Sequence, residues 1–137
     1  PGWGRFRDGA GASGHARAWV DAYARAWRAG DADAAAALYS EDVVYRSHPF
    51  REPHVGRDAV RAYSAEAYAA EGNRVVRFGE PVAAGSSAAV EYWTTFTEDA
   101  VPKTLAGCVL LDFDEGGFVT QSREYWHLQD GTFEAPH

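Results

Sequence analysis

The spacing of hydrophobic positions changes from helical to strand-like about half-way along the chain. In the first half, apolar residues recur every three or four positions, for example at Trp19, Val20, Tyr23 and Trp27, and this spacing is typical of one face of a helix. It predicts helices over residues 15–29, 32–39 and 57–71. Ser13 and Asp31 are suitable N-caps for the first two, and Gly30 and Gly72 are suitable residues to end the first and third.

The second half of the chain alternates apolar and polar residues, with a period of two. This pattern predicts strands over residues 74–83, 88–97, 103–114 and 118–127, which are separated by short segments of turn composition. Such short connections make the strands antiparallel neighbours. A further strand is expected over residues 43–47, where Pro49 and Pro53 prevent a regular continuation.

The order of these elements predicts an α+β fold of one domain. We expect a cone-shaped α+β barrel in which three N-terminal helices pack on one face of a curved, mainly antiparallel sheet and enclose a cavity. The domain is expected to span residues 15–128 of the 137. Residues 1–14 are interpreted as a mobile leader, native or added, and residues 129–137 as a C-terminal tail.

Charge and composition narrow the classes of partner. The chain has 13 Lys and Arg against 20 Asp and Glu, a formal charge of -7, which argues against nucleic acid or an anionic membrane surface as the main partner. The sequence contains neither an apolar run of membrane-spanning length nor a signal-peptide pattern. The single cysteine, Cys108, fits a reducing compartment, so we expect a cytoplasmic protein.

Polar residues are concentrated in the turn that follows the first predicted strand. His48, Glu52 and His54 are of metal-ligating types, but their spacing is not that of a common metal site, so no metal is expected. His48 lies directly before Pro49 and is a candidate general base, because the pKa of an unperturbed imidazole is near neutral. The alternative is a loop histidine that bonds to water.

Three stretches together carry a family resemblance: AWRAGDADAAAALYSEDVVY, FREPHVGRDAVRAY and VEYWTTFTEDAVPKTLAGCVLLDFDEGGFVTQSREYWH. In order and spacing they resemble the nuclear transport factor 2-like superfamily and, within it, the SnoaL-like branch. That superfamily includes ketosteroid isomerases, polyketide cyclases, limonene-type epoxide hydrolases and proteins without catalysis, so the resemblance implies a fold more than an activity.

The resemblance implies a role for several single residues. Tyr23 matches the tyrosine with which the isomerases donate to a substrate oxyanion, whereas Ser47 and Val109 stand where those enzymes have aspartates. Steroid isomerisation by that mechanism is therefore not expected. Glu124 matches a catalytic aspartate of the epoxide hydrolases, and Glu91 is a possible second carboxylate.

Strand alternation places Glu124 on the same face as Ser122 and Trp126. Periodicity does not say which face lines the cavity, but the family resemblance implies that this one does. Burial there would raise the pKa of Glu124 and suit it to acid–base chemistry near neutral pH. The alternative is a structural glutamate that is paired with an Arg or Tyr.

The aromatic residues are interpreted either as core or as the walls of the cavity, where they suit a small lipophilic ligand. Together with Ser47, the expected ligand-binding residues are Trp27, Tyr45, Tyr63, Trp93 and Trp126. The leading hypothesis is cofactor-free isomerase, cyclase or epoxide-hydrolase chemistry, carried out by Glu124 with His48, Tyr23 and Glu91. The alternative is a non-catalytic ligand-binding or dimerisation domain, and the resemblance also implies a homodimer.

Overall fold

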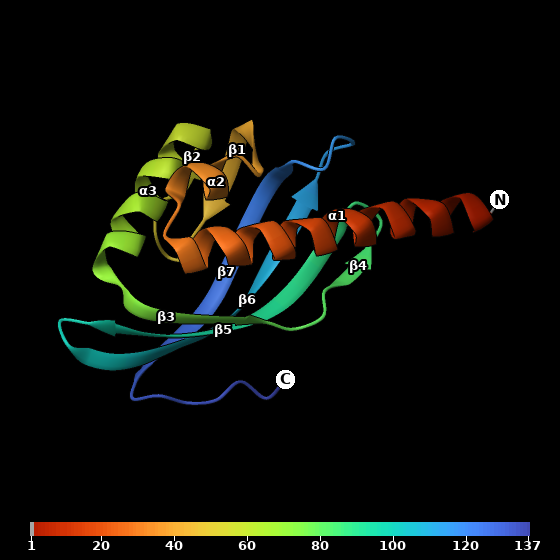
Figure 1. The fold of residues 1–137 in the computed structure, drawn as a ribbon. Helices are drawn as coiled ribbons and strands as arrows, with labels where there is room; N and C mark the ends of the chain where they lie inside the picture. The colour runs from red at the N-terminus through yellow and green to blue at the C-terminus, as the bar shows by residue number, and fades with distance from the viewer. Residues whose placement is uncertain (1) are drawn as a thin grey trace.

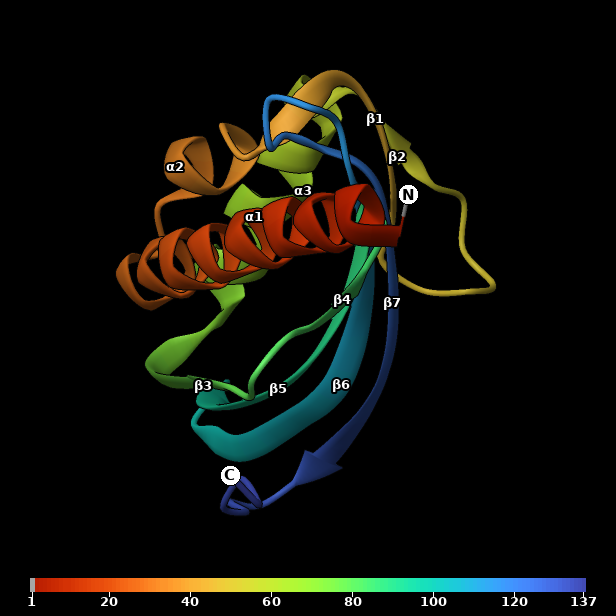
Figure 2. The same cartoon turned by 90° about the vertical axis from the view of Figure 1, so that its right-hand side faces the viewer.

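Within residues 2–137, which the computed structural model describes, seven strands form one strongly curved sheet, and the helices lie on its concave side (Figures 1 and 2). Side chains are described for residues 13–137. The helices are α1 (Gly2–Ala29), α2 (Ala32–Ala36) and α3 (Arg57–Ala70). The strands are β1 (Tyr39–Arg46), β2 (His54–Val55), β3 (Gly72–Phe78), β4 (Val82–Ala84), β5 (Ser87–Glu98), β6 (Val101–Phe113) and β7 (Val119–Asp130).

The strand order is β2-β1-β7-β6-β5-β3, and β4 pairs with β5 beside this path. Every pairing is antiparallel except that of β1 with β7, which is parallel. The predicted α+β class and the mainly antiparallel sheet are confirmed. The sheet curves around the helices without closing, so the cone is open along one side.

The bounds of several helices and strands differ from the predicted ones. The strand expected over residues 74–83 is divided into β3 and β4, because Gly79 and Pro81 fall between them and break the ladder. The second helix is shorter than expected, and β1 begins at Tyr39 instead of residue 43. The strand β2 was not expected.

The first helix begins before the cap expected at Ser13, since α1 includes residues from Gly2 onward. The side chains of residues 1–12 lie outside the described part of the chain, so the mobile leader expected over residues 1–14 stays a prediction.

Aromatic side chains of α1 form the centre of the core. Trp19 stacks on Tyr23 with ring centroids 4.5 Å apart, and Trp27 lies edge-on to Tyr92 of β5 at 5.7 Å. These residues follow the i, i+4 spacing of the sequence, so one stripe of the helix faces the concave side of the sheet. The helix thereby forms one wall of the space enclosed by the sheet.

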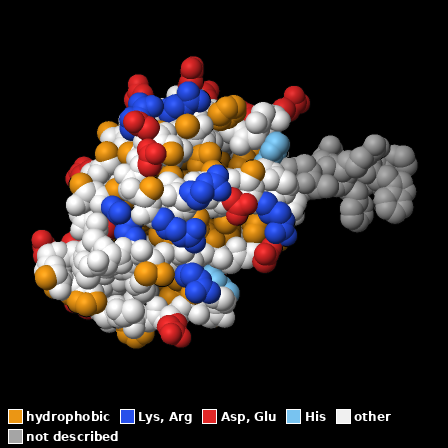
Figure 3. Space-filling view, viewed as in Figure 1, with side chains coloured by type: hydrophobic (Ala, Val, Ile, Leu, Met, Phe, Trp, Pro, Cys, Tyr) orange, Lys and Arg blue, Asp and Glu red, His pale blue; other side chains and the backbone are white. Residues whose placement is uncertain are grey.

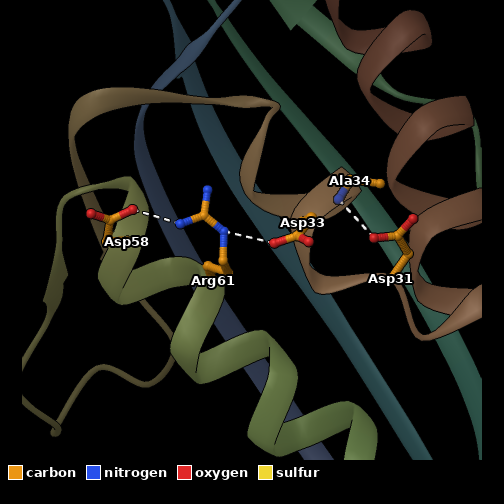
Figure 4. Close-up of polar contacts among 5 residues, drawn as sticks. All are labelled: Asp31, Asp33, Ala34, Asp58 and Arg61. Carbon is orange, nitrogen blue, oxygen red and sulfur yellow. Dashed lines mark hydrogen bonds and ion pairs between the residues drawn. The ribbon is translucent and has the colours of Figure 1, made fainter.

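The turn between α1 and α2 and the contact of α2 with α3 are both polar (Figure 4). Gly30 has φ of +67°, a conformation that favours glycine, and the Asp31 side chain then accepts a hydrogen bond from the Ala34 amide, as the predicted cap requires. Arg61 of α3 bridges Asp33 and Asp58 at 2.9 and 2.6 Å. All three side chains are solvent-accessible, so we expect these ion pairs to add little stability.

The C-terminal residues fold back over the convex side of the sheet (Figure 2). Thr104 donates to the Gly131 carbonyl at 2.8 Å and accepts from the Phe133 amide at 3.0 Å. Arg77 donates to the His137 carbonyl at 2.9 Å. Residues 131–137 therefore cover part of the convex face over β3, β5 and β6.

The described surface is mixed in charge. On the face seen in Figure 3, acidic and basic side chains are interspersed, so this face lacks the continuous basic patch that a phosphate backbone would favour. None of the helices in the described part of the chain is long and apolar enough to cross a membrane.

Candidate functional site

A cavity of about 240 Å³ lies between α1, α3 and the concave face of the sheet. Aromatic residues are the largest group in its wall, which also contains the carboxylates of Glu71, Glu98 and Glu124 and the guanidinium of Arg51. The aromatic lining residues are Tyr23, Trp27, Tyr45, Tyr63, Tyr68, Tyr92, Phe96 and Trp126. A space of this size and lining suits a small, largely apolar molecule.

The carboxylate of Glu124 accepts hydrogen bonds from two tyrosines. The Tyr45 hydroxyl donates to Oε2 at 2.6 Å, and the Tyr92 hydroxyl donates to Oε1 at 3.0 Å. Tyr45 is on β1 and Tyr92 on β5, so the side chain of Glu124 on β7 links three strands. Within residues 13–137, the ion pairs involve other carboxylates and leave Glu124 without a basic partner.

Gly107 makes the contact between Tyr92 and Glu124 possible. It lies on β6, directly between Tyr92 on β5 and Trp126 on β7. A Cβ atom at Gly107 would come within 2.7 Å of the Tyr92 hydroxyl and 2.8 Å of the Trp126 Cβ. The missing side chain therefore opens the space through which the Tyr92 phenol crosses β6 to reach the carboxylate.

Burial raises the pKa of the Glu124 carboxyl above its usual value, while the hydrogen bonds from Tyr45 and Tyr92 act in the opposite direction. Burial also raises the pKa values of Tyr45 and Tyr92, and the nearby charge of Glu124 adds to this effect. The two phenols therefore stay protonated as donors, and Glu124 is the group in this cluster that can exchange a proton most readily.

The other two cavity acids are neutralised in part by basic neighbours. Glu71 Oε1 accepts from Arg74 Nε at 3.0 Å and from the Trp27 indole at 3.0 Å, while Glu98 pairs with Lys103 at 3.0 Å. Burial raises the pKa of Glu71, and the contacts with Trp27 and Arg74 lower it. Glu124 thus differs from them in having hydroxyl partners alone.

The structure brings together six of the residues predicted for the site. Strand alternation had correctly grouped Glu124 with Trp126, and both face the cavity. The six residues that line it are Tyr23, Trp27, Tyr45, Tyr63, Glu124 and Trp126.

Ser47 and His48 lie next to the cavity without lining it. Ser47 is buried, its carbonyl accepts from the Trp126 indole at 2.6 Å, and its hydroxyl is 3.4 Å from His54 Nε2. The His48 and Trp126 rings pack edge to face with their centroids 5.3 Å apart, and His48 Nδ1 accepts a hydrogen bond from the Phe50 amide at 3.2 Å. Both residues therefore support the wall formed by Trp126.

Glu91 and Trp93 lie on the convex face, away from the cavity. The Trp93 indole donates to Glu91 Oε2 at 2.6 Å, and His137 of the tail lies 3.8 Å from the same oxygen. The expected carboxylate pair of Glu91 with Glu124 is not formed. The reason is strand alternation: Val90, Tyr92 and Phe96 are buried on the concave side, so the residues between them point outward.

The two histidines of the polar turn do not form a metal centre. The His54 ring packs on Tyr63 at 4.3 Å, and burial lowers its pKa. Among the described residues, no three His, Cys, Asp or Glu side chains are grouped so that they could hold a metal ion.

Sequence reasoning missed several cavity residues, chiefly Tyr68, Glu71, Tyr92 and Phe96. For Tyr68 a signal was present, because it continues the i, i+4 series of Val60 and Ser64 on the buried face of α3. For Tyr92 and Phe96 the signal was the alternation within β5. The partnership of Tyr92 with Glu124 had no local signal, because it depends on the strand order.

Comparison with known proteins agrees with this architecture. The family model for the SnoaL-like domain matches residues 20–121, which is most of the chain. This protein belongs to the SnoaL-like domain family. The resemblance to the nuclear transport factor 2-like superfamily inferred from sequence is thereby confirmed. A search of curated proteins found no match to this SnoaL-like protein.

Solved structures share the fold of this SnoaL-like protein at low identity. SalBIII, an epoxide hydrolase/cyclase-like enzyme in pyran ring formation in polyether salinomycin, is 19% identical with a TM-score of 0.74, over 84% of this chain and 95% of its own. A hypothetical protein of ketosteroid isomerase-like fold from Catenulispora acidiphila, in complex with trimethylamine, is 22% identical with a TM-score of 0.70, over 78% and 83%. An LEH-like epoxide hydrolase of M. tuberculosis is 19% identical with a TM-score of 0.69, over 82% and 83%.

Proposed function

We propose that this protein binds a small, largely apolar molecule in the cavity and transfers a proton on it through the Glu124 carboxyl, without a cofactor. The reaction would be of the isomerase, cyclase or epoxide-hydrolase type. The observation that carries the proposal is an acid without a basic partner, held by two phenols, in a cavity whose wall is otherwise mainly aromatic and aliphatic. A carboxyl whose pKa is raised by burial suits general acid–base catalysis near neutral pH.

The structural relatives support this use of the cavity. One is described as an epoxide hydrolase/cyclase-like enzyme and one as an LEH-like epoxide hydrolase, while a third holds trimethylamine. Because Glu91 and His48 do not line the cavity, the proposed chemistry relies on the Glu124 carboxyl, with Tyr23, which lines the cavity, as the candidate donor to a developing oxyanion.

A non-catalytic ligand-binding domain is the second candidate, and one observation favours it. Both oxygens of Glu124 already accept hydrogen bonds, and these join β1, β5 and β7. A carboxylate used in this way can be a structural link between strands. The two candidates differ in whether the carboxyl exchanges its proton with a ligand.

Elimination of nitrobenzisoxazole tests the proposal with a defined probe. This planar, apolar molecule loses the C–H proton beside its ring nitrogen to a base, its N–O bond breaks, and a coloured cyanophenolate forms. We expect the wild-type protein to accelerate this step, and Glu124→Gln to lower the rate at least 100-fold, the lower end of the range for removal of a general base. Glu91→Gln is the matched control and should keep the wild-type rate. Equal rates for wild type and Glu124→Gln would support the non-catalytic candidate.

We also propose that the protein forms a homodimer through the part of the convex face that the C-terminal residues leave uncovered. Tyr125 is 49% exposed there and lies opposite Cys108 in the β6–β7 ladder. An exposed aromatic residue on a sheet face is common at protein interfaces. The cytoplasmic location expected from the sequence stays a prediction, which cell fractionation would test.

A further inference from the structure

We propose that Tyr68 is a ligand-positioning residue, whose hydroxyl donates a hydrogen bond to an acceptor oxygen of the molecule in the cavity. The ligand would therefore carry a carbonyl, epoxide or ether oxygen on an otherwise apolar body. This inference deepens the proposed function and rests on it in one respect, namely that a small molecule occupies the cavity.

Tyr68 is a buried residue with an unused polar group. Its side chain lines the cavity, only 6% of the residue is exposed, and its hydroxyl oxygen has no hydrogen-bond partner among the described residues. A buried polar group without a partner costs about 1–3 kcal/mol. A ligand oxygen beside this hydroxyl would remove that cost.

Tyr68 differs from the other buried polar groups that lack a partner. Trp19 Nε1, Thr94 Oγ1 and Ser122 Oγ have none in the described structure either, but these three residues do not line the cavity. Of these four groups, the Tyr68 hydroxyl is therefore the only one that belongs to a residue lining the cavity.

The position of Tyr68 is fixed by its neighbours. The Arg74 guanidinium lies 5.5 Å from the centre of the Tyr68 ring and also donates to the Tyr68 carbonyl oxygen. Arg74 is itself held by Glu71, which accepts from Trp27 of α1. The phenol is thus oriented before any ligand arrives, which reduces the entropy lost on binding.

The protonation state of Tyr68 suits a donor. Burial raises its pKa above the ordinary value, so the phenol keeps its proton at neutral pH. Tyr23 lines the same cavity, and its hydroxyl lies close enough to lower the pKa of Tyr68 in part, while the charge of an ionised Tyr68 would raise the pKa of Tyr23. Both phenols keep their protons at neutral pH, so each can donate a hydrogen bond to a ligand oxygen.

The test compares two probes of similar shape, acetophenone, which has an acceptor oxygen, and ethylbenzene, which has none. We expect the wild-type protein to bind acetophenone more tightly than ethylbenzene, and Tyr68→Phe to reduce that preference by about 5- to 10-fold, the equivalent of one neutral hydrogen bond. The carbonyl stretching frequency of bound acetophenone should also rise in Tyr68→Phe, because the carbonyl then loses a donor. A merely structural role of Tyr68 would not change this frequency.

Tyr39→Phe is the matched control, because Tyr39 is buried but does not line the cavity. It should keep both the wild-type preference and the wild-type frequency. The inference is overturned if Tyr68→Phe keeps the wild-type preference for acetophenone and the wild-type carbonyl stretching frequency. It is also overturned if Tyr39→Phe has the same effect as Tyr68→Phe, or if the wild type binds acetophenone no better than ethylbenzene.

The outcomes also separate this inference from the proposed function. If Glu124→Gln leaves nitrobenzisoxazole elimination unchanged while the acetophenone preference depends on Tyr68, proton transfer fails and the positioning role stands. If the elimination depends on Glu124 while Tyr68→Phe changes nothing, the reverse holds.

Discussion

The hydroxyl of Tyr45 donates a 2.6 Å hydrogen bond to Oε2 of Glu124 across 79 positions of sequence. The contact joins β1 to β7, the one parallel pair in the sheet, and holds the carboxylate against the aromatic wall of the cavity. The same bond stabilises the ionised form of Glu124, whereas burial disfavours that form. The chemistry of the site depends on the balance between these two effects.

The pH dependence of stability should report the raised pKa of Glu124. Between the ordinary glutamate pKa of about 4.3 and the raised native value, the native state keeps a proton that the unfolded state has lost. The free energy of unfolding therefore falls as pH rises through this window and levels off above it. Urea denaturation at a series of pH values should show a smaller fall in Glu124→Gln than in the wild type.

Glu71 contributes to the same curve with the same sign, because burial also raises its pKa. The difference between the wild-type and Glu124→Gln curves isolates the contribution of Glu124. Parallel curves for the two proteins would contradict the raised pKa.

Removing a phenol that donates to Glu124 should raise the pKa of this carboxyl further. In Tyr45→Phe the ionised form loses a 2.6 Å hydrogen bond, so the acidic limb of the pH–rate profile for nitrobenzisoxazole should move to higher pH. Tyr92→Phe should move it in the same direction. Tyr63→Phe is the control, since Tyr63 lines the cavity without bonding to Glu124. An unchanged profile in both Tyr45→Phe and Tyr92→Phe would show that Glu124 is not the base.

Gly107→Ala should displace the Tyr92 phenol and so weaken its hydrogen bond to Glu124. The new Cβ would lie 2.7 Å from the Tyr92 hydroxyl and 2.8 Å from the Trp126 Cβ, and such overpacking costs about 1–3 kcal/mol. Chemical denaturation should show this loss, and the pH–rate profile should shift as it does in Tyr92→Phe. Gly14→Ala is the control, because a Cβ at Gly14 meets nothing within 4 Å and lies in a helix, so stability should stay the same or rise. Full wild-type stability of Gly107→Ala would mean that Tyr92 can leave Glu124 at little cost.

The proposed dimer should be sensitive to charge on the uncovered convex face. Tyr125→Glu places a carboxylate at an exposed position opposite Cys108, and burying this charge at an interface would be unfavourable. Light scattering should give a dimer mass for the wild type and a monomer mass for the variant. A monomer mass for the wild type at working concentration would exclude the dimer, and Glu66→Gln, on an exposed position of α3, controls for a general effect of charge.

How far the sequence leads is clearest on β5 and β7. Alternation in β7 correctly placed Glu124 and Trp126 on one face, and the family resemblance chose the face that lines the cavity. In β5 the buried positions alternate with Glu91 and Trp93, so these two residues lie on the convex face and the expected pairing of Glu91 with Glu124 is not formed. His48 was predicted as a general base because it lies in the polar turn and an unperturbed imidazole has a near-neutral pKa, whereas in space its ring lies beside Trp126 and does not line the cavity.

The sequence by itself determined the helices, most strands, the Asp31 cap and the family, because these depend on residues a few positions apart. The strand order, the curvature of the sheet and the glycine gap at Gly107 decided which side chains meet. Only the tertiary structure could bring Tyr45 and Tyr92 to Glu124, and leave the Tyr68 hydroxyl buried without a partner. Those contacts depend on register between strands far apart in sequence, which no local periodicity encodes.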